Sequence, residues 1–231
     1  MKKLVIFDFW DTVVNYNFDP IKANSLMLKH SLKNPDNIDA YRLGMEIKNV
    51  FTTIRKMSEE IEVPFASMHY FVHRKLNLKM DEDYDELEYL FTKEGHSLSL
   101  VDGVKEFIEY ILEKGYKIAI LSNTILKSKT QERILKELLP DIKFSFIIST
   151  SEWVFRKPNI RIFNVALMHA NMDPQDIYFI GDNFKADVMG SSNAGMTPIW
   201  YNPNHKGKIA DIDCIEIGSY QELLKYFEKE N

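Results

Sequence analysis

The chain has 231 residues, of which 45% are hydrophobic and 27% charged, so it is long enough to fold as one large domain or two modest ones. Its 34 acidic and 29 basic side chains give a net charge of −5, which provides no general attraction for nucleic acid or an anionic membrane, and its apolar runs are shorter than the roughly 20 residues that a membrane-spanning helix needs. Cys214 is the single cysteine, so no intrachain disulfide can form, and we expect a cytoplasmic protein.

The first predicted element is a buried strand at residues 4–7, because four consecutive apolar residues end at Asp8. The stretch from residue 20 to residue 98 differs, because helical patterns follow one another there with no strand run between them. We therefore expect an all-helical insertion, with helices at residues 21–32, 38–57, 65–76 and 84–91.

From residue 100 onward, strand and helix patterns alternate. The predicted strands lie at residues 117–121, 144–148, 177–180, 197–201 and 214–217, and the predicted helices at 104–114, 125–139, 160–169, 186–194 and 220–228. This alternation predicts an α/β fold with a mainly parallel sheet and helices on both of its faces.

The division into domains follows from the position of the helical insertion. Roughly eighty residues separate the first strand from the rest of its sheet, which is too long for an ordinary connection and long enough for a small domain. We expect an α/β core domain formed by residues 1–15 and 99–231 and a helical cap domain formed by residues 16–98.

Polar residues come directly after three of the predicted strands, and another lies in the segment that follows a fourth strand. Asp8 follows the first strand, Ser122-Asn123 follows the second of the core, and Gly181-Asp182 follows a later one, with Asp187 five residues further on and Lys157 in the segment after residue 148. In open parallel sheets, ligands bind beyond the carboxyl ends of the strands. A divalent cation between the carboxylates, with Lys157 and Ser122 holding a phosphoryl group, makes chemical sense there, and Mg²⁺ suits an oxygen-only site.

These residues resemble the four motifs of the haloacid dehalogenase superfamily, in the family's order and over nearly the whole chain. The similar segments are Leu4-Val5-Ile6-Phe7-Asp8-Phe9-Trp10-Asp11-Thr12-Val13, then Ile120-Leu121-Ser122-Asn123, then Arg156-Lys157-Pro158, and then Gly181-Asp182-Asn183-Phe184-Lys185-Ala186-Asp187. Each motif alone is weak, whereas four in order with matching strand contexts are specific. The resemblance implies a Rossmann-like core with a helical cap that excludes water and selects small substrates.

The resemblance also implies roles for individual residues. Asp8 is the expected nucleophile, which forms an aspartyl-phosphate that water then hydrolyses. The side chains of Asp8 and Asp182 and the backbone carbonyl of Trp10 are the expected Mg²⁺ ligands. The remaining expected residues support them: Ser122, Asn123 and Lys157 around the phosphate, Asp187 and Asn183 behind the metal ligands, and Thr12 orienting the first loop.

Trp10 departs from the family pattern. In the family's phosphatases, this position carries a second aspartate that protonates the leaving group and then activates water. An indole N–H cannot act as a general acid or base near neutral pH, so a contribution typically worth about 10²–10⁴-fold is missing from its usual place. We expect a phosphohydrolase limited to leaving groups that need little protonation, such as those of acyl or aryl phosphates, or one that uses an acid from the cap or from Asp11.

Three alternatives stay open. The protein is also compatible with a haloacid dehalogenase, since halide needs no proton, although Gly181-Asp182 keeps the metal-binding form. A slow or non-catalytic regulatory protein that retains the phosphate and Mg²⁺ site is the second. Phosphonate cleavage through a Schiff base on a cap lysine is the third, with the candidates Lys22, Lys29, Lys48, Lys56 and Lys75.

Two further patterns have ordinary structural explanations. His69 and His73 lie four residues apart on one predicted helix, as in a zinc pair, but no third ligand stands out, so core or solvated histidines are expected. The cap carries no motif that specifies a substrate beyond a small phosphorylated metabolite, and no feature specifies an oligomeric state.

Overall fold

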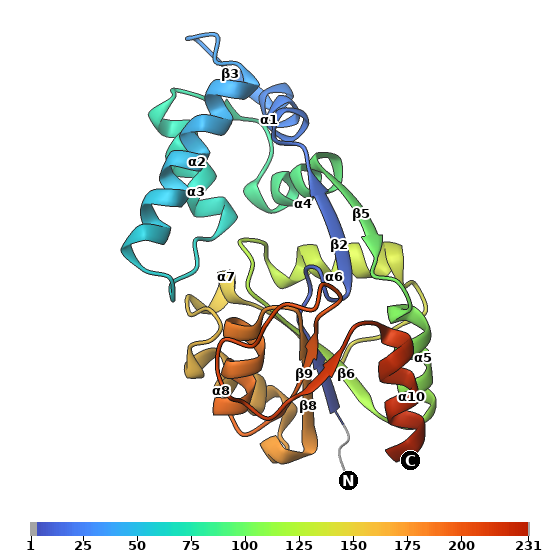
Figure 1. Cartoon of the computed structure of the whole chain (residues 1–231). Coiled ribbons are helices and arrows are strands. Elements are labelled where there is room, and N and C mark those ends of the chain that lie inside the picture. Colours follow the sequence, from blue (N-terminus) through green and yellow to red (C-terminus); the bar gives the residue numbers. More distant parts are fainter. Residues whose placement is uncertain (1–3, 231) are drawn as a thin grey trace.

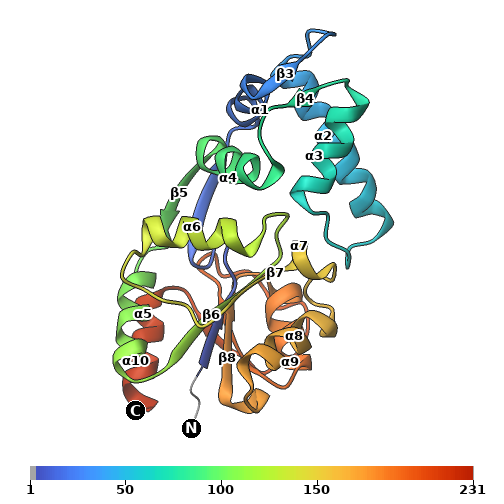
Figure 2. The same ribbon diagram turned by 180° about the vertical axis from the view of Figure 1, so that it is seen from behind.

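The computed structural model describes residues 4–230, and its centre is a six-stranded parallel sheet (Figures 1 and 2). The strand order is β10-β9-β8-β1-β6-β7, so the first strand of the chain lies inside the sheet. The strands are β1 (Leu4–Phe7), β6 (Lys117–Ser122), β7 (Ile147–Ser149), β8 (Ile177–Gly181), β9 (Thr197–Tyr201) and β10 (Ile215–Ile217). The predicted α/β fold with a parallel sheet is confirmed.

Helices cover both faces of the sheet, because successive side chains of each strand point to opposite faces. In β1, Val5 and Phe7 belong to a hydrophobic cluster shared with α5 (Val104–Glu113), α6 (Ser128–Leu138) and α10 (Tyr220–Glu230). Leu4 and Ile6 belong to a second cluster, shared with α8 (Ile160–Ala170). The residues of β1 are buried in both clusters, so this central strand is held firmly and with it the position of Asp8, which follows the strand.

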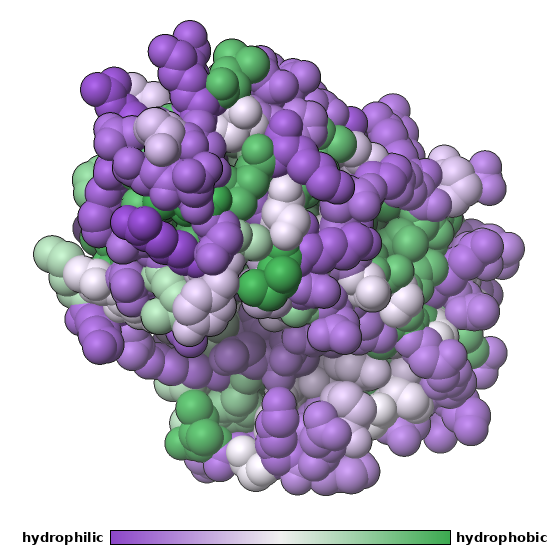
Figure 3. Space-filling view, turned by 90° about the horizontal axis from the view of Figure 1, so that it is seen from above, coloured by the Kyte–Doolittle hydropathy of each residue, from purple (hydrophilic) through white to green (hydrophobic). Residues whose placement is uncertain are grey.

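A helical unit lies beyond the carboxyl ends of the strands (Figure 1). It consists of α1 (Pro20–Lys29), α2 (Ala40–Met57), α3 (Phe65–Lys75) and α4 (Tyr84–Gly95), which share their own hydrophobic cluster. Aspartate side chains cap the backbone N–H groups at the starts of three of these helices, namely α1, α2 and α4. Seen from above, the surface of the molecule is mainly hydrophilic, with small hydrophobic patches (Figure 3).

The insertion is not all-helical, and this prediction was wrong. β2 (Val14–Phe18) pairs antiparallel with β5 (His96–Leu100), and β3 (Ser31–Lys33) pairs with β4 (Lys79–Met80). Both β2 and β5 alternate apolar and polar residues, which is the period of a two-stranded ribbon rather than of a helix. The boundaries expected at residues 15/16 and 98/99 fall inside this ribbon, and the division into two domains stays a prediction.

Smaller differences concern the ends of elements. The helix expected from residue 125 begins at Ser128, and the strand expected from residue 144 begins at Ile147. The helix expected at residues 186–194 is a π-helical turn, η2 (Phe184–Met189), followed by α9 (Gly190–Asn193). The short helices α7 (Thr150–Trp153) and η1 (Pro174–Asp176) complete the structure. Within residues 4–230, none of the helices combines the length and the apolar character needed to cross a membrane.

Candidate active site

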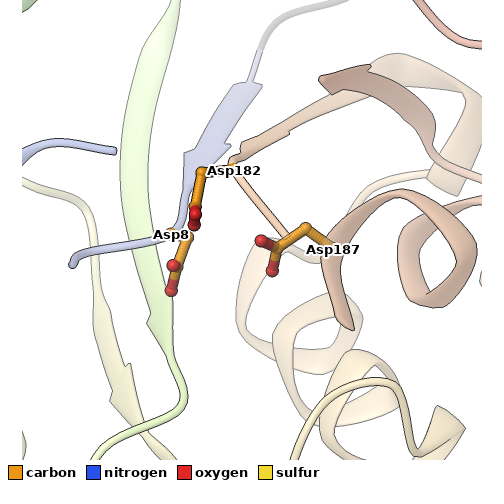
Figure 4. A group of neighbouring side chains, drawn as sticks. All are labelled: Asp8, Asp182 and Asp187. Atoms are coloured by element: carbon orange, nitrogen blue, oxygen red, sulfur yellow. The ribbon is translucent and has the colours of Figure 1, made fainter. Parts of the chain in front are cut away.

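Three aspartates meet at the carboxyl edge of the sheet. Asp8 and Asp182 follow the paired strands β1 and β8, and the Asp8 N–H donates to the carbonyl of Ile180 at 2.8 Å. Asp187 reaches toward them from the π-helical turn η2 (Figure 4). A carboxylate oxygen from each of the three lies within 4.8 Å of the others, a spacing that a single cation can bridge. The structure therefore brings these three residues together at one edge of the sheet, as the sequence predicted.

Lys157 joins two of these carboxylates. Its Nζ lies 2.8 Å from Oδ1 of Asp8 and 2.6 Å from Oδ1 of Asp187, and its side chain is 1% exposed. Burial alone would lower the pKa of Lys157, but the carboxylates of Asp187 and Asp8 raise it above the usual value. The lysine is therefore a fixed cation beside Asp8.

The position of Asp187 is determined by its surroundings. Its Oδ2 accepts a hydrogen bond from the backbone N–H of Asn183 at 2.9 Å. Gly181 packs directly against it, since a Cβ at this glycine would lie 2.3 Å from Cγ and Oδ2 of Asp187. Glycine at the end of β8 is thus required for the carboxylate to come this close to the sheet.

Asp182 differs from Asp8 and Asp187, because it forms no ion pair with any of the described residues. Burial, followed by the negative charges of Asp8 and Asp11, raises the pKa of Asp182 to about 6. Its backbone carbonyl accepts a hydrogen bond from Nε1 of Trp200 at 3.0 Å, which holds the turn after β8. The excess negative charge at this point and the all-oxygen donor set fit a hard divalent cation.

Two hydroxyl groups near Asp8 are buried without a hydrogen-bond partner in the described part of the chain. They are Oγ of Ser122, at the end of β6, and Oγ1 of Thr12, in the loop after β1. A buried hydroxyl without a partner is costly, so each is a natural donor or acceptor for a bound group. Ser122 thus lies at the carboxyl edge of the sheet, and its phosphate-binding role stays a prediction.

The side-chain amide of Asn123 bonds to the backbone of Lys157. Its Oδ1 accepts from the backbone N–H of Lys157 at 2.8 Å, and its Nδ2 donates to the carbonyl of the same residue at 3.0 Å. Both ends of the amide are therefore engaged in holding the lysine segment. The phosphate contact expected of Asn123 stays a prediction, whereas its positioning of Lys157 is visible in the structure.

Trp10 is held by its own hydrogen bond. Nε1 donates to Oγ1 of Thr124 at 3.3 Å, and the indole lies against the ring of Tyr16, with the ring centroids 4.9 Å apart. Asp11 has a positive φ of 56°. Partial desolvation, followed by the negative charge of Asp8, raises the pKa of Asp11. Asp11 is therefore close enough to interact electrostatically with the nucleophile.

The other candidate residues lie elsewhere. His69 and His73 are buried in the helical unit and bond to the carbonyl of Phe65 and the hydroxyl of Tyr84, so they are core histidines, as expected. Of the five cap lysines, Lys56 lines a cleft of 840 Å³ together with Lys157. This cleft opens between α2 and the sheet edge, where Asn123 and Asn183 also line it.

One buried carboxylate that contacts the residue before Lys157 was missed by sequence reasoning. Glu62, in the loop between α2 and α3, is 3% exposed and pairs with Arg156 and Arg55. Its hydroxyl donor is Thr150 at 2.8 Å, at the start of α7. The segment around it, Glu59-Glu60-Ile61-Glu62, has an ordinary solvent-exposed composition, so no sequence signal separates this buried carboxylate from its neighbours.

Comparison with known proteins gives a consistent result. A family model described as haloacid dehalogenase-like hydrolase matches residues 5–201. The chain is 27% identical to the glyceraldehyde 3-phosphate phosphatase of Pyrococcus abyssi, over 100% of this chain and 96% of that protein. It is 26% identical to the pyrimidine 5'-nucleotidase PynA of Streptococcus pneumoniae, over 98% of this chain and 95% of that protein.

Two solved structures share the fold. One is a 2-haloacid dehalogenase from Pseudomonas syringae, with a TM-score of 0.68 and 23% identity over 100% of both chains. The other is a HAD phosphatase from Thermococcus onnurineus, with a TM-score of 0.65 and 22% identity over 97% of both chains. At these identities the likeness concerns the fold alone.

Proposed function

The chain belongs to the haloacid dehalogenase-like hydrolase family, and we propose that it is a Mg²⁺-dependent phosphohydrolase of a small phosphorylated metabolite, with Asp8 as nucleophile. The observation that carries the proposal is the arrangement at the sheet edge, where Lys157 pairs with Asp8 and Asp187 while Asp182 forms no ion pair among the described residues. The names of the relatives, a sugar-phosphate phosphatase and a nucleotidase, favour phosphate esters as the substrate class.

The metal ion would be held by the carboxylates of Asp8 and Asp182 and the backbone carbonyl of Trp10. Bound there, Mg²⁺ supplies Lewis-acid stabilisation of the phosphoryl charge. Asp187 is engaged by Lys157 and by the N–H of Asn183, so we assign it to holding the lysine rather than to direct metal binding.

The chemistry proceeds in two displacements. A carboxylate oxygen of Asp8 attacks phosphorus, a bond between that oxygen and phosphorus forms, and the bond from phosphorus to the ester oxygen breaks. Water then attacks phosphorus, which releases inorganic phosphate and restores Asp8. Lys157 offsets the charge that accumulates beside the nucleophile, and the free hydroxyl of Ser122 donates to a phosphoryl oxygen.

The leaving group determines which esters react. Trp10 supplies no proton, and its N–H is committed to Thr124, so the departing oxygen must leave with little protonation or receive a proton from elsewhere. We therefore propose aryl and acyl phosphates as better substrates than alkyl esters, with Asp11 as the alternative acid. Metal-free dehalogenation is disfavoured by the third carboxylate, Asp182, which forms no ion pair among the described residues and lies where it can serve as a metal ligand.

We also propose that residues 16–98 act as a cap over a core of residues 1–15 and 99–231, in a cytoplasmic protein. Ion pairs connect the two parts on the side of α4 and α6, where Arg133 Nη1 lies 2.7 Å from Oε2 of Glu86 and Lys127 pairs with Asp85. On the side of the cleft, Arg156 pairs with Glu62. A lid anchored on both sides excludes water from the carboxylates between them.

The test is a panel of aryl, acyl and alkyl phosphates and 2-haloacids, each with and without Mg²⁺, on the wild type and on Asp8→Asn and Trp10→Asp variants. We expect Mg²⁺-dependent release of phosphate from the aryl and acyl phosphates, no turnover by Asp8→Asn, and a gain on alkyl phosphates for Trp10→Asp. Metal-independent release of halide would refute the phosphohydrolase proposal. Binding of Mg²⁺ and phosphate without turnover of any ester would favour the regulatory alternative.

A further inference from the structure

Glu62 crosses from the helical unit to the sheet edge. Its backbone N–H donates to the carbonyl of Val154 at 2.6 Å, and the backbone N–H of Arg156 donates in return to the carbonyl of Glu60 at 2.8 Å. This pairing forms a short antiparallel bridge between Ile61 and Phe155. The two segments are therefore registered against each other by their backbones before any side chain is considered.

The carboxylate of Glu62 makes contacts on all sides. Its side chain is 0% exposed, Oε2 lies 2.9 Å from Nη1 of Arg156, and Oε1 accepts from the N–H of Val63 at 3.0 Å. Burial raises the pKa of Glu62, whereas the charge of Arg55 and the hydrogen bonds lower it. A buried carboxylate in such a network adds little net stability over an apolar replacement, and its best-attested use is to specify one arrangement.

The first connection leads to the catalytic lysine. Arg156 precedes Lys157 in the chain, and it is held by the carbonyl of Glu60 and the carboxylate of Glu62. On the other side of the same segment, Asn123 holds the backbone of Lys157 at both its N–H and its carbonyl. The lysine backbone is thus fixed from the cap on one side and from the sheet on the other, which places Nζ between two carboxylates.

The second connection leads to Trp10. The hydroxyl of Thr150 donates to Oε2 of Glu62 at 2.8 Å and accepts from the backbone N–H of Thr124 at 3.0 Å. The hydroxyl of Thr124 accepts in turn from Nε1 of Trp10 at 3.3 Å. Thr124 thus contacts Thr150 through its backbone and Trp10 through its side chain, so a shift of Thr150 would move the residue that holds the indole of Trp10.

We propose that Glu62 is a positioning residue that couples docking of the helical unit to the placement of Lys157 and Trp10 around the nucleophile. This inference rests on the proposed function for its catalytic consequence, but not for its structural one. When the loop carrying Glu62 is docked, both connections are complete. When it withdraws, Arg156 and Thr150 lose their partner together, and the site loses its order on both sides of Asp8 at once.

The test compares Glu62→Gln, which keeps the shape and removes the charge, with Glu59→Gln in the same loop. Glu59 is a matched control, because it also pairs with a core residue, Lys185 at 3.0 Å, but its side chain is 82% exposed. The catalytic readout is kcat and KM for an aryl phosphate with Mg²⁺. The structural readout, independent of turnover, is the NMR resonance of the Trp10 indole N–H, assigned with Trp10→Phe.

For Glu62→Gln we expect a shifted Trp10 indole resonance and a kcat lowered about tenfold or more with a smaller change in KM, because an interaction that orders the site acts on the chemical step. Glu62→Asp should recover part of kcat, and Glu59→Gln should change neither readout. A folded Glu62→Gln protein with the wild-type resonance and kcat would overturn the inference. If no ester is turned over by the wild type, the proposed function fails while the resonance still decides the inference.

A second variant keeps the test valid if Glu62→Gln does not fold, as judged by circular dichroism. Thr150→Val cuts the connection to Trp10 and leaves the ion pairs of Glu62 in place. It should shift the Trp10 resonance as Glu62→Gln is expected to, and an unshifted resonance would refute the connection through Thr150.

Discussion

Replacing Gly181 with alanine is expected to disturb the active site through a single added methyl group. The backbone at Gly181 is not in the left-handed region, so a strand alanine would on its own stabilise the protein by about 0.4–1 kcal/mol. The added Cβ, however, would lie 2.3 Å from Cγ and Oδ2 of Asp187, and ordinary contact requires about 1 Å more. The carboxylate must therefore move away from the 2.6 Å contact that it makes with Lys157.

The magnitude follows from these contacts. Overpacking of this kind typically costs about 1–3 kcal/mol, which outweighs the gain from the alanine backbone. A displacement of about 1 Å in a residue that holds Lys157, for which we propose a catalytic role, can lower turnover by about 100-fold. Gly181→Ala should therefore lose both stability and kcat, whereas Gly207→Ala, whose Cβ would have nothing within 4 Å, should lose neither.

The measurements are urea unfolding followed by circular dichroism and steady-state kinetics with an aryl phosphate. The double variant Gly181→Ala/Asp187→Ala adds a check on cause, because removing the carboxylate makes room for the methyl group and the two stability costs should not add. Wild-type stability and kcat in Gly181→Ala would refute the argument that the glycine is needed for the approach of Asp187.

Three further predictions concern stability. Burial raises the pKa of Glu88 to about 7, so the stability that this group contributes is complete below about pH 4.5 and is lost as the pH rises toward 7. The variant Glu88→Gln can still accept hydrogen bonds from the N–H of Lys127 and the hydroxyl of Thr130. In urea unfolding at pH 8 it should therefore be more stable than the wild type by about 1–3 kcal/mol. Burial, followed by the charge of His73, lowers the pKa of His69 to about 3, so the stability that this group contributes above pH 6.5 is lost as the pH falls. Between pH 7 and pH 5, the free energy of unfolding of the wild type should therefore fall by about 2 kcal/mol more than that of His69→Phe. The same pH dependence of unfolding in both proteins would contradict this. Mg²⁺ at about a hundred times its Kd should stabilise the wild type by about 2.7 kcal/mol but not Asp182→Asn, as measured by thermal unfolding with Ca²⁺-free and EDTA-treated controls.

The parts of the fold that were predicted correctly are those with strong local signals. The run at residues 4–7 is continuous and apolar, and residues 197–201 are rich in aromatic and branched side chains; the strands β1 and β9 have these bounds. The residues that follow buried strands necessarily meet at one edge of a parallel sheet, which is why Asp8, Ser122 and Asp182 were found without knowledge of the strand order. Local sequence patterns thus predict which residues lie at the carboxyl edge of the sheet.

The parts that were missed depend on pairing between distant segments. The ribbon of β2 and β5 joins residues about eighty positions apart, and each strand alone carries only five alternating residues next to strong helical patterns. Likewise, Glu62 differs from Glu59 and Glu60 only in what it contacts after the chain has folded, namely Arg156 and Thr150. Burial of a charged side chain against a distant segment leaves no local trace.

Trp10 joins the two kinds of feature. Its sequence position predicts the loss of a general acid beside Asp8, and its contacts add that the indole N–H donates to Thr124, the residue that Glu62 reaches through Thr150. Trp10→Asp therefore makes two changes at once: it supplies an acid, and it removes the donor to Thr124. Alkyl phosphates should gain from the first change and lose from the second, so their rescue by Trp10→Asp, measured as kcat/KM for an alkyl phosphate, should be partial.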